Sequence, residues 1–140
     1  MSEGTRFPLA TSSWDDREYA AIDRVVKSGF FSMGGEVATF ESQFAAAMGT
    51  QYAIMVNSGS SANLIIIAAL RYHSRHRLPA GAEVIVPAVS WSTTYYPLHQ
   101  YGLRMKFVDI DPHTLNYDLD ALSAAIGPET RAILVVNLLG

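Results

Sequence analysis

The chain has 140 residues, the size of one ordinary domain, of which 49% are hydrophobic and 16% charged. This composition favours a globular protein over a disordered one, since the net charge is only −3 and there is ample apolar material for a core. The ten basic residues are scattered, so we expect no nucleic-acid-binding surface. The sequence contains no cysteine, which excludes disulfides, zinc ribbons and thiol nucleophiles. We predict no metal site.

Targeting and membrane signals are missing from the sequence. The first residues lack a basic stretch followed by an apolar run, so no signal peptide is expected. The longest uninterrupted apolar run, residues 64–70, is much shorter than the roughly 20 residues of a membrane-spanning helix. We therefore expect a soluble, cytoplasmic protein that does not bind a membrane.

Two amphipathic helices are predicted in the first third of the chain. Ser13 and Asp16 resemble a capping box, and apolar residues then recur at helical spacing until Gly29. A second apolar stripe predicts a helix over residues 36–48, which the following glycine ends. We expect the two phenylalanines of the connecting loop, residues 30–35, to fill a core.

From residue 52 onward, strand and helix patterns alternate. Strands are predicted at residues 52–56, 83–86, 105–108 and 131–136, and helices at 60–72, 92–101 and 119–126. Four strands separated by three helices predict a parallel sheet with right-handed crossovers. Three of the strands are apolar without alternation, as in a sheet covered on both faces. No helix or strand follows the last of them, so we expect the front part of a larger protein.

The end of the first predicted strand is followed by a turn of small polar residues, 57–63. A turn that opens a helix offers free backbone N–H groups and the positive end of the helix dipole to an anion. Gly59 would permit a backbone conformation that a Cβ resists, and Ser60 adds a hydroxyl donor. The turn therefore predicts a phosphate site, although it is neither a Walker A nor a dinucleotide loop. The alternative is a serine-capped helix that binds nothing.

An aromatic and polar stretch, residues 87–97, follows the second predicted strand. Because the carboxyl ends of parallel strands form one edge of a sheet, Trp91 should lie at the same edge as Ser60. Its indole would then stack on a flat heterocycle beside the phosphate. The competing interpretation is a core tryptophan beneath a loop.

Four ordered stretches carry a likeness to a known family. They are residues 58–63 (SGSSAN), 81–87 (GAEVIVP), 91–94 (WSTT) and 107–111 (FVDID). In order and spacing they resemble the DegT/DnrJ/EryC1/StrS family of pyridoxal-phosphate enzymes that act on nucleotide sugars, and the likeness runs from Ser12 to Gly140. Residues 12–16 and 88–97 are most similar to the family's branch of GDP-4-keto-6-deoxymannose 3-dehydratases, which belong to the colitose pathway.

The resemblance implies an α/β fold, the N-terminal part of a fold-type I aminotransferase-like large domain with a mostly parallel sheet and helices on both faces. It implies that residues 1–35 form an N-terminal arm, a helix and an active-site loop, and that residues 36–140 form the first, truncated part of the cofactor-binding domain. By the same resemblance, Gly59 and Ser60 bind the phosphate of pyridoxal 5′-phosphate or pyridoxamine 5′-phosphate, and Trp91 stacks on the pyridine ring.

The implied activity is C3 dehydration of, or amino transfer to, a nucleotide-linked 4-keto-6-deoxy sugar in deoxysugar or lipopolysaccharide O-antigen biosynthesis. The implied assembly is a homodimer with a shared active site. The family's ring-nitrogen aspartate and its Schiff-base lysine, a histidine in the dehydratase branch, would lie beyond Gly140. Neither Lys27 nor Lys106 stands at that lysine's position, so no catalytic residue is assigned and the chain alone is expected to be inactive.

Two other interpretations stay open from the sequence. One is a truncated α/β protein that binds a phosphate-bearing ligand or a partner without catalysing a reaction. The other is an unrelated α/β domain that uses the polar turn for a different phosphate ligand. Both share the phosphate-binding turn with the enzyme interpretation, so the turn alone does not separate them.

Overall fold

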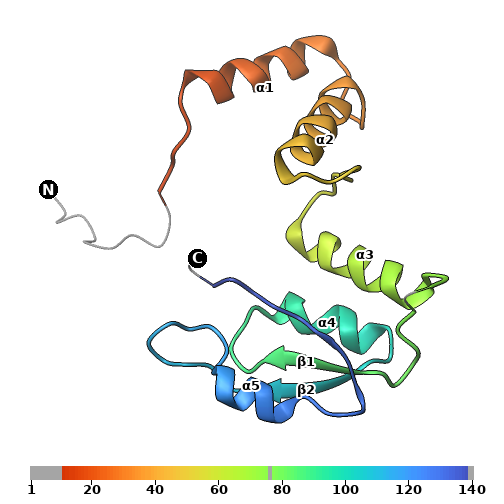
Figure 1. The fold of residues 1–140 in the computed structure, drawn as a ribbon. Helices are drawn as coiled ribbons and strands as arrows, with labels where there is room; N and C mark the ends of the chain where they lie inside the picture. The colour runs from red at the N-terminus through yellow and green to blue at the C-terminus, as the bar shows by residue number, and fades with distance from the viewer. Residues whose placement is uncertain (1–10, 76, 139–140) are drawn as a thin grey trace, which may run out of the picture. The chain divides into compact units, whose positions relative to one another are not determined.

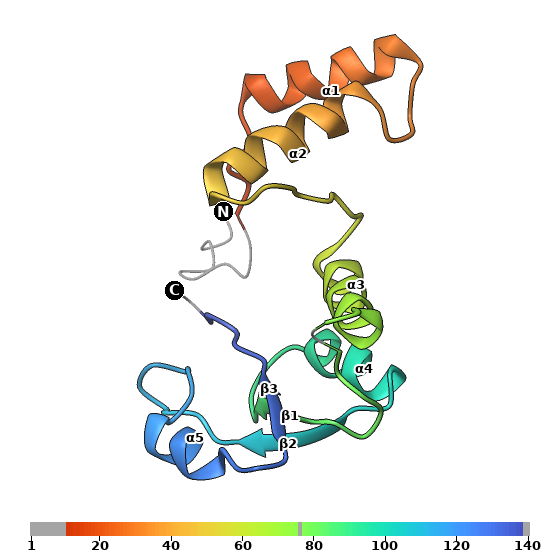
Figure 2. The same cartoon turned by 45° about the vertical axis from the view of Figure 1, so that its right-hand side comes forward.

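The computed structural model describes residues 11–75 and 77–138. The chain divides into two compact units, Met1–Met55 and Val56–Gly140. The first unit carries helices α1 and α2, and the second carries a small α/β sheet (Figures 1 and 2). The predicted arm before residue 11 lies outside the described residues, and the predicted functional division between residues 35 and 36 stays a prediction.

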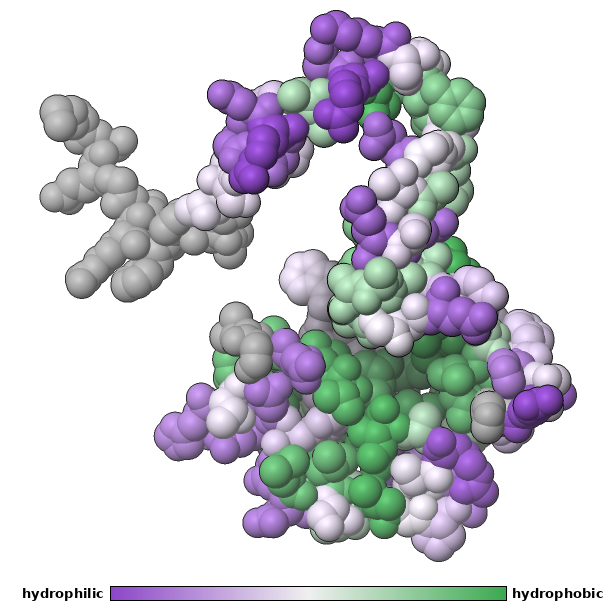
Figure 3. All heavy atoms as spheres, turned by 45° about the horizontal axis from the view of Figure 1, so that its top comes forward, coloured by the Kyte–Doolittle hydropathy of each residue, from purple (hydrophilic) through white to green (hydrophobic). Residues whose placement is uncertain are grey.

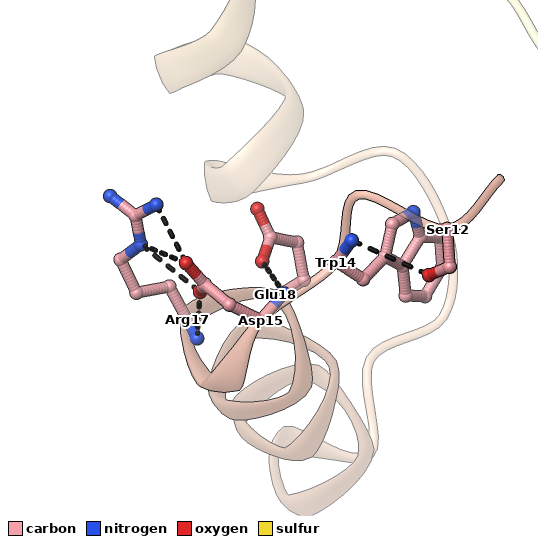
Figure 4. Close-up of polar contacts among 5 residues, drawn as sticks. All are labelled: Ser12, Trp14, Asp15, Arg17 and Glu18. Carbon is pink, nitrogen blue, oxygen red and sulfur yellow. Dashed lines mark hydrogen bonds and ion pairs between the residues drawn. The ribbon is translucent and has the colours of Figure 1, made fainter.

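Helix α1, Asp16–Ser28, begins at a true capping box. The Asp15 carboxylate accepts hydrogen bonds from backbone N–H groups of the first turn, and the Asp15 N–H donates to Glu18 Oε2 over 2.8 Å (Figure 4). The box predicted at Ser13 was therefore placed two residues too early. The reciprocal bond requires a side chain long enough to reach back over one turn, which a glutamate provides and an aspartate does not.

Helix α2, Gly35–Met48, confirms the second predicted helix. Gly29 and Gly49 end α1 and α2 with φ angles of 67° and 65°, a left-handed conformation that favours glycine. Phe30 and Phe31 of the connecting loop are 58% and 75% exposed, so they do not fill a core within the described chain, contrary to expectation.

Residues 52–56 do not form the predicted strand. Tyr52 and Ile54 are each 76% exposed, and the N–H of Met55 donates to Glu41 Oε1 rather than to a strand. A β-strand exists only through hydrogen bonds to a neighbouring strand, and the described part of the chain supplies no neighbour here. Residues 52–56 therefore have the composition of a strand but no neighbouring strand to pair with in the described part of the chain.

The second unit contains α3 (Gly59–Tyr72), β1 (Glu83–Pro87), α4 (Ser92–Gln100), β2 (Arg104–Val108), α5 (Leu119–Ala125) and β3 (Thr130–Ile133). The strand order is β2-β1-β3 and both pairings are parallel, which confirms the predicted parallel sheet with three strands instead of four. The last strand ends earlier than predicted. Among the described residues, no helix is long and apolar enough to cross a membrane.

The central strand β1 is buried on both faces, as its unbroken apolar sequence predicted. Val84 and Val86 point to one face, where they pack with Ile67 of α3 and Leu98 of α4. Ile85 points to the other face and packs with side chains of the loop before α5 and of α5 itself. Helices therefore cover both faces of the sheet, and the two cores meet at β1.

The connections place a crevice at the carboxyl end of the sheet. The chain passes from β1 through α4 to β2 on one side, and then through α5 on the opposite face to β3 on the other side of β1. Where successive connections depart to opposite faces, the carboxyl ends of adjacent strands leave room between their loops, and ligands of open α/β sheets bind there. In this chain β1 and β2 are adjacent strands whose connections leave to opposite faces, so the room expected for a ligand lies at the carboxyl ends of these two strands.

Candidate functional site

The start of α3 is a serine-capped helix end. Ser58 Oγ accepts a hydrogen bond from the Ser61 N–H over 3.1 Å and also contacts the Ser61 hydroxyl at 3.2 Å. The Ala62 N–H donates to the Ser58 carbonyl over 3.0 Å. These bonds leave the N–H groups of Gly59 and Ser60 without a protein partner in the described part of the chain, so they are available to an anion.

Gly59 contributes space, not an unusual backbone conformation. It is the first residue of α3, and a Cβ built on it would meet no atom within 4 Å. Its φ angle lies outside the left-handed range, so the expectation that Gly59 is needed for its backbone freedom is wrong. The open space lets a ligand approach the helix end closely, and the exposed Ser60 beside it offers its hydroxyl.

The start of α4 lies next to this helix end. The Asn63 side-chain amide donates to the Thr93 carbonyl over 3.3 Å, which ties the first turns of the two helices together. A hollow of about 220 Å³ lies between them. It is lined by Ser60, Ser61, Leu64, Thr93, Tyr96, Pro97 and Gln100. Ser60 and the residues after Trp91 therefore share one edge of the unit, while Trp91 itself is not part of this lining.

Trp91 is a surface residue in this structure. It is the N-cap residue of α4, its side chain is 77% exposed, and its carbonyl accepts from the Thr94 N–H over 2.9 Å. The exposure rules out the interpretation of Trp91 as a core tryptophan within the described chain. An indole held at a helix start at the carboxyl edge of the sheet has a free face that can stack on a flat ring.

Sequence reasoning missed two tyrosines at the same edge. Tyr95 donates to the Pro87 carbonyl, and Tyr117 donates to the Leu134 carbonyl, each over 2.8 Å. Burial raises the pKa of Tyr95, although a hydrogen bond with Ser90 lowers it. Burial, with a smaller contribution from the charge of Tyr95, raises the pKa of Tyr117 to about 12. Both phenols are therefore held as neutral hydrogen-bond donors near neutral pH.

A larger apolar groove of about 470 Å³ lies between α3 and the end of β3. Most of its lining is aliphatic, and Figure 3 shows hydrophobic side chains gathered on this unit. Burying a phosphate against aliphatic side chains is unfavourable because nothing there replaces its hydration. The start of α3, with two free N–H groups and a hydroxyl, is the better place for an anion.

The predicted active-site loop belongs to the first unit and is described separately. A hollow of about 420 Å³ is lined by parts of α1, the loop and the start of α2. Arg24 and Glu36 form an exposed ion pair across it, with 3.8 Å between nitrogen and oxygen. A Cβ on Gly34 would lie 2.5 Å from a ring carbon of Phe30, so any larger residue there would displace this exposed ring. Its role in an active site stays a prediction.

Comparison with known proteins gives a consistent result. The model of the DegT/DnrJ/EryC1/StrS aminotransferase family matches residues 12–140. The GDP-4-keto-6-deoxy-D-mannose 3-dehydratase of Escherichia coli O55:H7 is 60% identical over 134 residues, which cover 96% of this chain and 34% of that protein. The chain thus spans about a third of the length of this curated relative.

Solved structures agree. The E. coli GDP-4-keto-6-deoxy-D-mannose 3-dehydratase with bound hydrated PLP matches with a TM-score of 0.91 and 60% identity, covering 96% of this chain and 34% of that one. A variant of a GDP-4-keto-6-deoxymannose 3-dehydratase with bound GDP-perosamine has the same TM-score and identity, and 35% of it is covered. These matches confirm the predicted fold, the N-terminal part of a fold-type I aminotransferase-like large domain, and exclude an unrelated α/β domain. The chain belongs to the DegT/DnrJ/EryC1/StrS aminotransferase family.

Proposed function

We propose that this chain supplies the phosphate-binding and ring-stacking part of a pyridoxal-phosphate or pyridoxamine-phosphate site in a protein that removes the C3 hydroxyl of a GDP-linked 4-keto-6-deoxy sugar. One observation carries the proposal: free N–H groups at Gly59 and Ser60, with open space before them, lie at the edge of the sheet that also bears the exposed Trp91. The 60% identity to a dehydratase supports the choice of reaction.

The residues of the chain fit the cofactor's phosphate. Its negative charge matches the positive end of the α3 dipole, and the two N–H groups with the Ser60 hydroxyl provide donors for its oxygens. The side-chain bond from Asn63 to Thr93 holds the start of α4 beside them. The phosphate would therefore be held mainly by backbone donors, which a side-chain substitution does not remove.

Trp91 would cover one face of the pyridine ring. An exposed indole has apolar surface to bury, and a stacked aromatic pair adds about 1 kcal/mol beyond the buried area. Covering the ring also excludes water from that face. Bound there, the cofactor supplies the electron sink for bond breaking at the sugar. The described residues bind and orient it, and we assign none of them a proton-transfer role.

The proposal includes a cytoplasmic homodimer whose subunits share the active site. Its support is the apolar surface of the first unit, where Phe31, Met33 and Phe44 are 75%, 63% and 48% exposed. Two alternatives use the same start of α3. Amino transfer would replace a sugar oxygen by nitrogen, and non-catalytic binding of a phosphate-bearing ligand or a partner would make no use of Trp91.

The test uses the protein expressed from its full coding sequence. Removal of the C3 hydroxyl reduces the sugar by two electrons, so the incubation contains pyridoxamine 5′-phosphate, which supplies them on becoming pyridoxal 5′-phosphate, and an amino-acid donor that regenerates it. With GDP-4-keto-6-deoxymannose, the protein should yield a product that has lost the C3 hydroxyl, as read by mass spectrometry. A product that carries a new amino group would favour amino transfer, and an unchanged sugar would favour non-catalytic binding.

Site variants test the assignment of residues. Trp91→Ala should weaken cofactor binding about fivefold, since a stacked pair contributes about 1 kcal/mol. Ser60→Ala should weaken it by a similar factor through one lost hydrogen bond. Ser123→Ala, the same substitution on the exposed face of α5, is the matched control and should leave binding unchanged. If both site variants bind the cofactor with unchanged affinity, the cofactor does not bind at this edge of the sheet.

A further inference from the structure

The hydrogen-bond ladder between β1 and β3 stops at a proline. Ile85 pairs with Ile133, and the Leu134 N–H donates to the Ile85 carbonyl over 2.9 Å. In a parallel pair, the next residue of β1 facing β3 is Pro87, whose N–H would donate to the Leu134 carbonyl. Proline has no N–H, so this bond cannot form. The missing donor explains why β3 ends before the predicted residue 136.

Two phenols take the places of the missing ladder bonds. The Tyr117 hydroxyl donates to the Leu134 carbonyl, and the Tyr95 hydroxyl donates to the Pro87 carbonyl. They come from opposite faces of the sheet: Tyr95 packs with the core beneath α3 and α4, and Tyr117 belongs to the core that α5 covers. The Pro87 and Leu134 carbonyls are thus satisfied by side chains at the point where the ladder stops, so neither is left unpaired.

Tyr95 is also linked to the segment that carries Trp91. Pro87 is buried, and only three residues separate it from the indole. The Ala88 N–H donates to the Val108 carbonyl over 2.8 Å, and the Ser90 and Thr94 hydroxyls lie 2.8 Å apart. The loop is therefore anchored at both ends, by the strand and Tyr95 at its start and by the first turn of α4 at its end.

The Tyr95 ring is itself fixed. It packs against Phe107 of β2 with 5.5 Å between the ring centroids, and it lies half-buried in the core beneath α4. Because core packing fixes the position of the Tyr95 ring, its hydroxyl is a fixed hydrogen-bond donor. The bond to the Pro87 carbonyl therefore restrains the start of the loop. Without the bond, the start of the loop would keep only its pairing with β2, on the side of β1 away from β3, and the Pro87 carbonyl would have no donor.

We propose that Tyr95 is a positioning residue, which holds the Pro87 carbonyl and thereby presents the Trp91 indole at the phosphate-binding start of α3. This inference rests on the proposed function, because Trp91 must stack on the cofactor for its position to matter. Tyr95 does not touch the cofactor, and its effect on binding passes through Trp91.

The test is a double-mutant cycle in the protein expressed from its full coding sequence, with cofactor affinity read from the visible absorption band. Tyr95→Phe keeps the ring and removes the hydroxyl, and it should weaken binding about fivefold. In a Trp91→Ala background, the same change should have no further effect. Tyr101→Phe, at the far end of α4, is the control and should leave affinity unchanged.

Each outcome separates the two proposals. If Tyr95→Phe weakens binding equally in both backgrounds, its role is merely structural and the inference fails. If Trp91→Ala weakens binding and Tyr95→Phe does not, the inference fails and the proposed function stands. If Trp91→Ala has no effect, the stacking role fails, and with it the positioning role. Should Tyr95→Phe fold poorly, Thr94→Val removes the hydroxyl pair at the other loop anchor and must show the same dependence on Trp91.

Discussion

The two units of the chain obtain their structure in different ways. In the described part of the first unit, Ala45 is the single buried residue, and the apolar stripes of α1 and α2 remain exposed. In the second unit, Ile85, Val86 and Leu98 are 0% exposed, and two cores enclose the central strand. One unit is built from local signals and the other from packing between segments distant in sequence.

The first unit shows that local sequence signals set the ends of a helix but do not by themselves stabilise it. The capping box at Asp15 and the left-handed glycines at the helix ends define where α1 and α2 begin and end. Helices of 13 and 14 residues are only marginally stable without tertiary packing. Burial of their exposed apolar stripes would stabilise these helices. In the proposed homodimer, the partner subunit would bury them. The sheet unit already covers its central strand.

The largest expected effect tests this contrast directly. In the 140-residue chain, Ile85→Ala should cost about 3 kcal/mol of unfolding free energy, because it leaves a cavity between the sheet and α5. Phe44→Ala, at a side chain that is 48% exposed, should cost less than about 1 kcal/mol. Urea unfolding followed by circular dichroism measures both. Equal losses would mean that the stripe of α2 is buried in solution, and a dilution series would show whether self-association buries it.

The second effect concerns Tyr117 at alkaline pH. Its pKa is raised from 10.0 to about 12 in the folded chain, so the folded state keeps a proton that the unfolded state has lost. The resulting stability is complete below pH 10 and is lost as the pH rises towards 12, with a change on the order of 2 kcal/mol. Tyr117→Phe should flatten this decline, whereas Tyr52→Phe, at an exposed ring, should not. An identical slope in both variants would contradict the buried phenol.

A smaller effect is expected at the start of α3, a helix that is stabilised both by the Ser58 cap and by packing of Ile67 in the core. Ser58→Ala removes the acceptor for the Ser61 N–H and should cost about 1 kcal/mol. Ser58→Asn retains an acceptor and should restore most of it. The loss of stability is measured by the hydrogen-exchange rates of the α3 amides. If the exchange rates are the same in Ser58→Ala, packing of Ile67 alone stabilises the first turn.

The smallest effect is expected at the exposed cap of α1. Hydrogen bonds from the Arg17 side chain and backbone hold the pKa of Asp15 below its ordinary value of 3.8. The cap therefore contributes above that value and is lost as the pH falls through the lowered pKa. Asp15→Asn keeps an acceptor without titrating, so the helical signal of α1 should lose this acid transition. Persistence of the transition in the variant would assign it to another carboxylate.

Much of the candidate site was predictable because it depends on neighbours in sequence. The Ser58 cap, the start of α3 beside it and the position of Trp91 after a strand follow from residue types within a few positions, and the family motifs are contiguous. The Tyr95 and Tyr117 bonds were not predictable in this way. The Tyr95 bond joins residues 8 positions apart and the Tyr117 bond joins residues 17 apart. Pro87 has no N–H for the Leu134 carbonyl, and the pairing that would give the Pro87 carbonyl a donor is not continued beyond that point.

By itself, the sequence determined the helices, the glycine ends of α1 and α2, the parallel α/β pattern and the family, while it placed the capping box of α1 two residues too early. Each of these depends on interactions within a turn or on short contiguous motifs. The tertiary structure alone decided that residues 52–56 form no strand, that β3 ends at Ile133 and that Trp91 is exposed. These properties depend on which segments pack together, since a strand needs a partner and burial needs a neighbour, and a local pattern specifies neither.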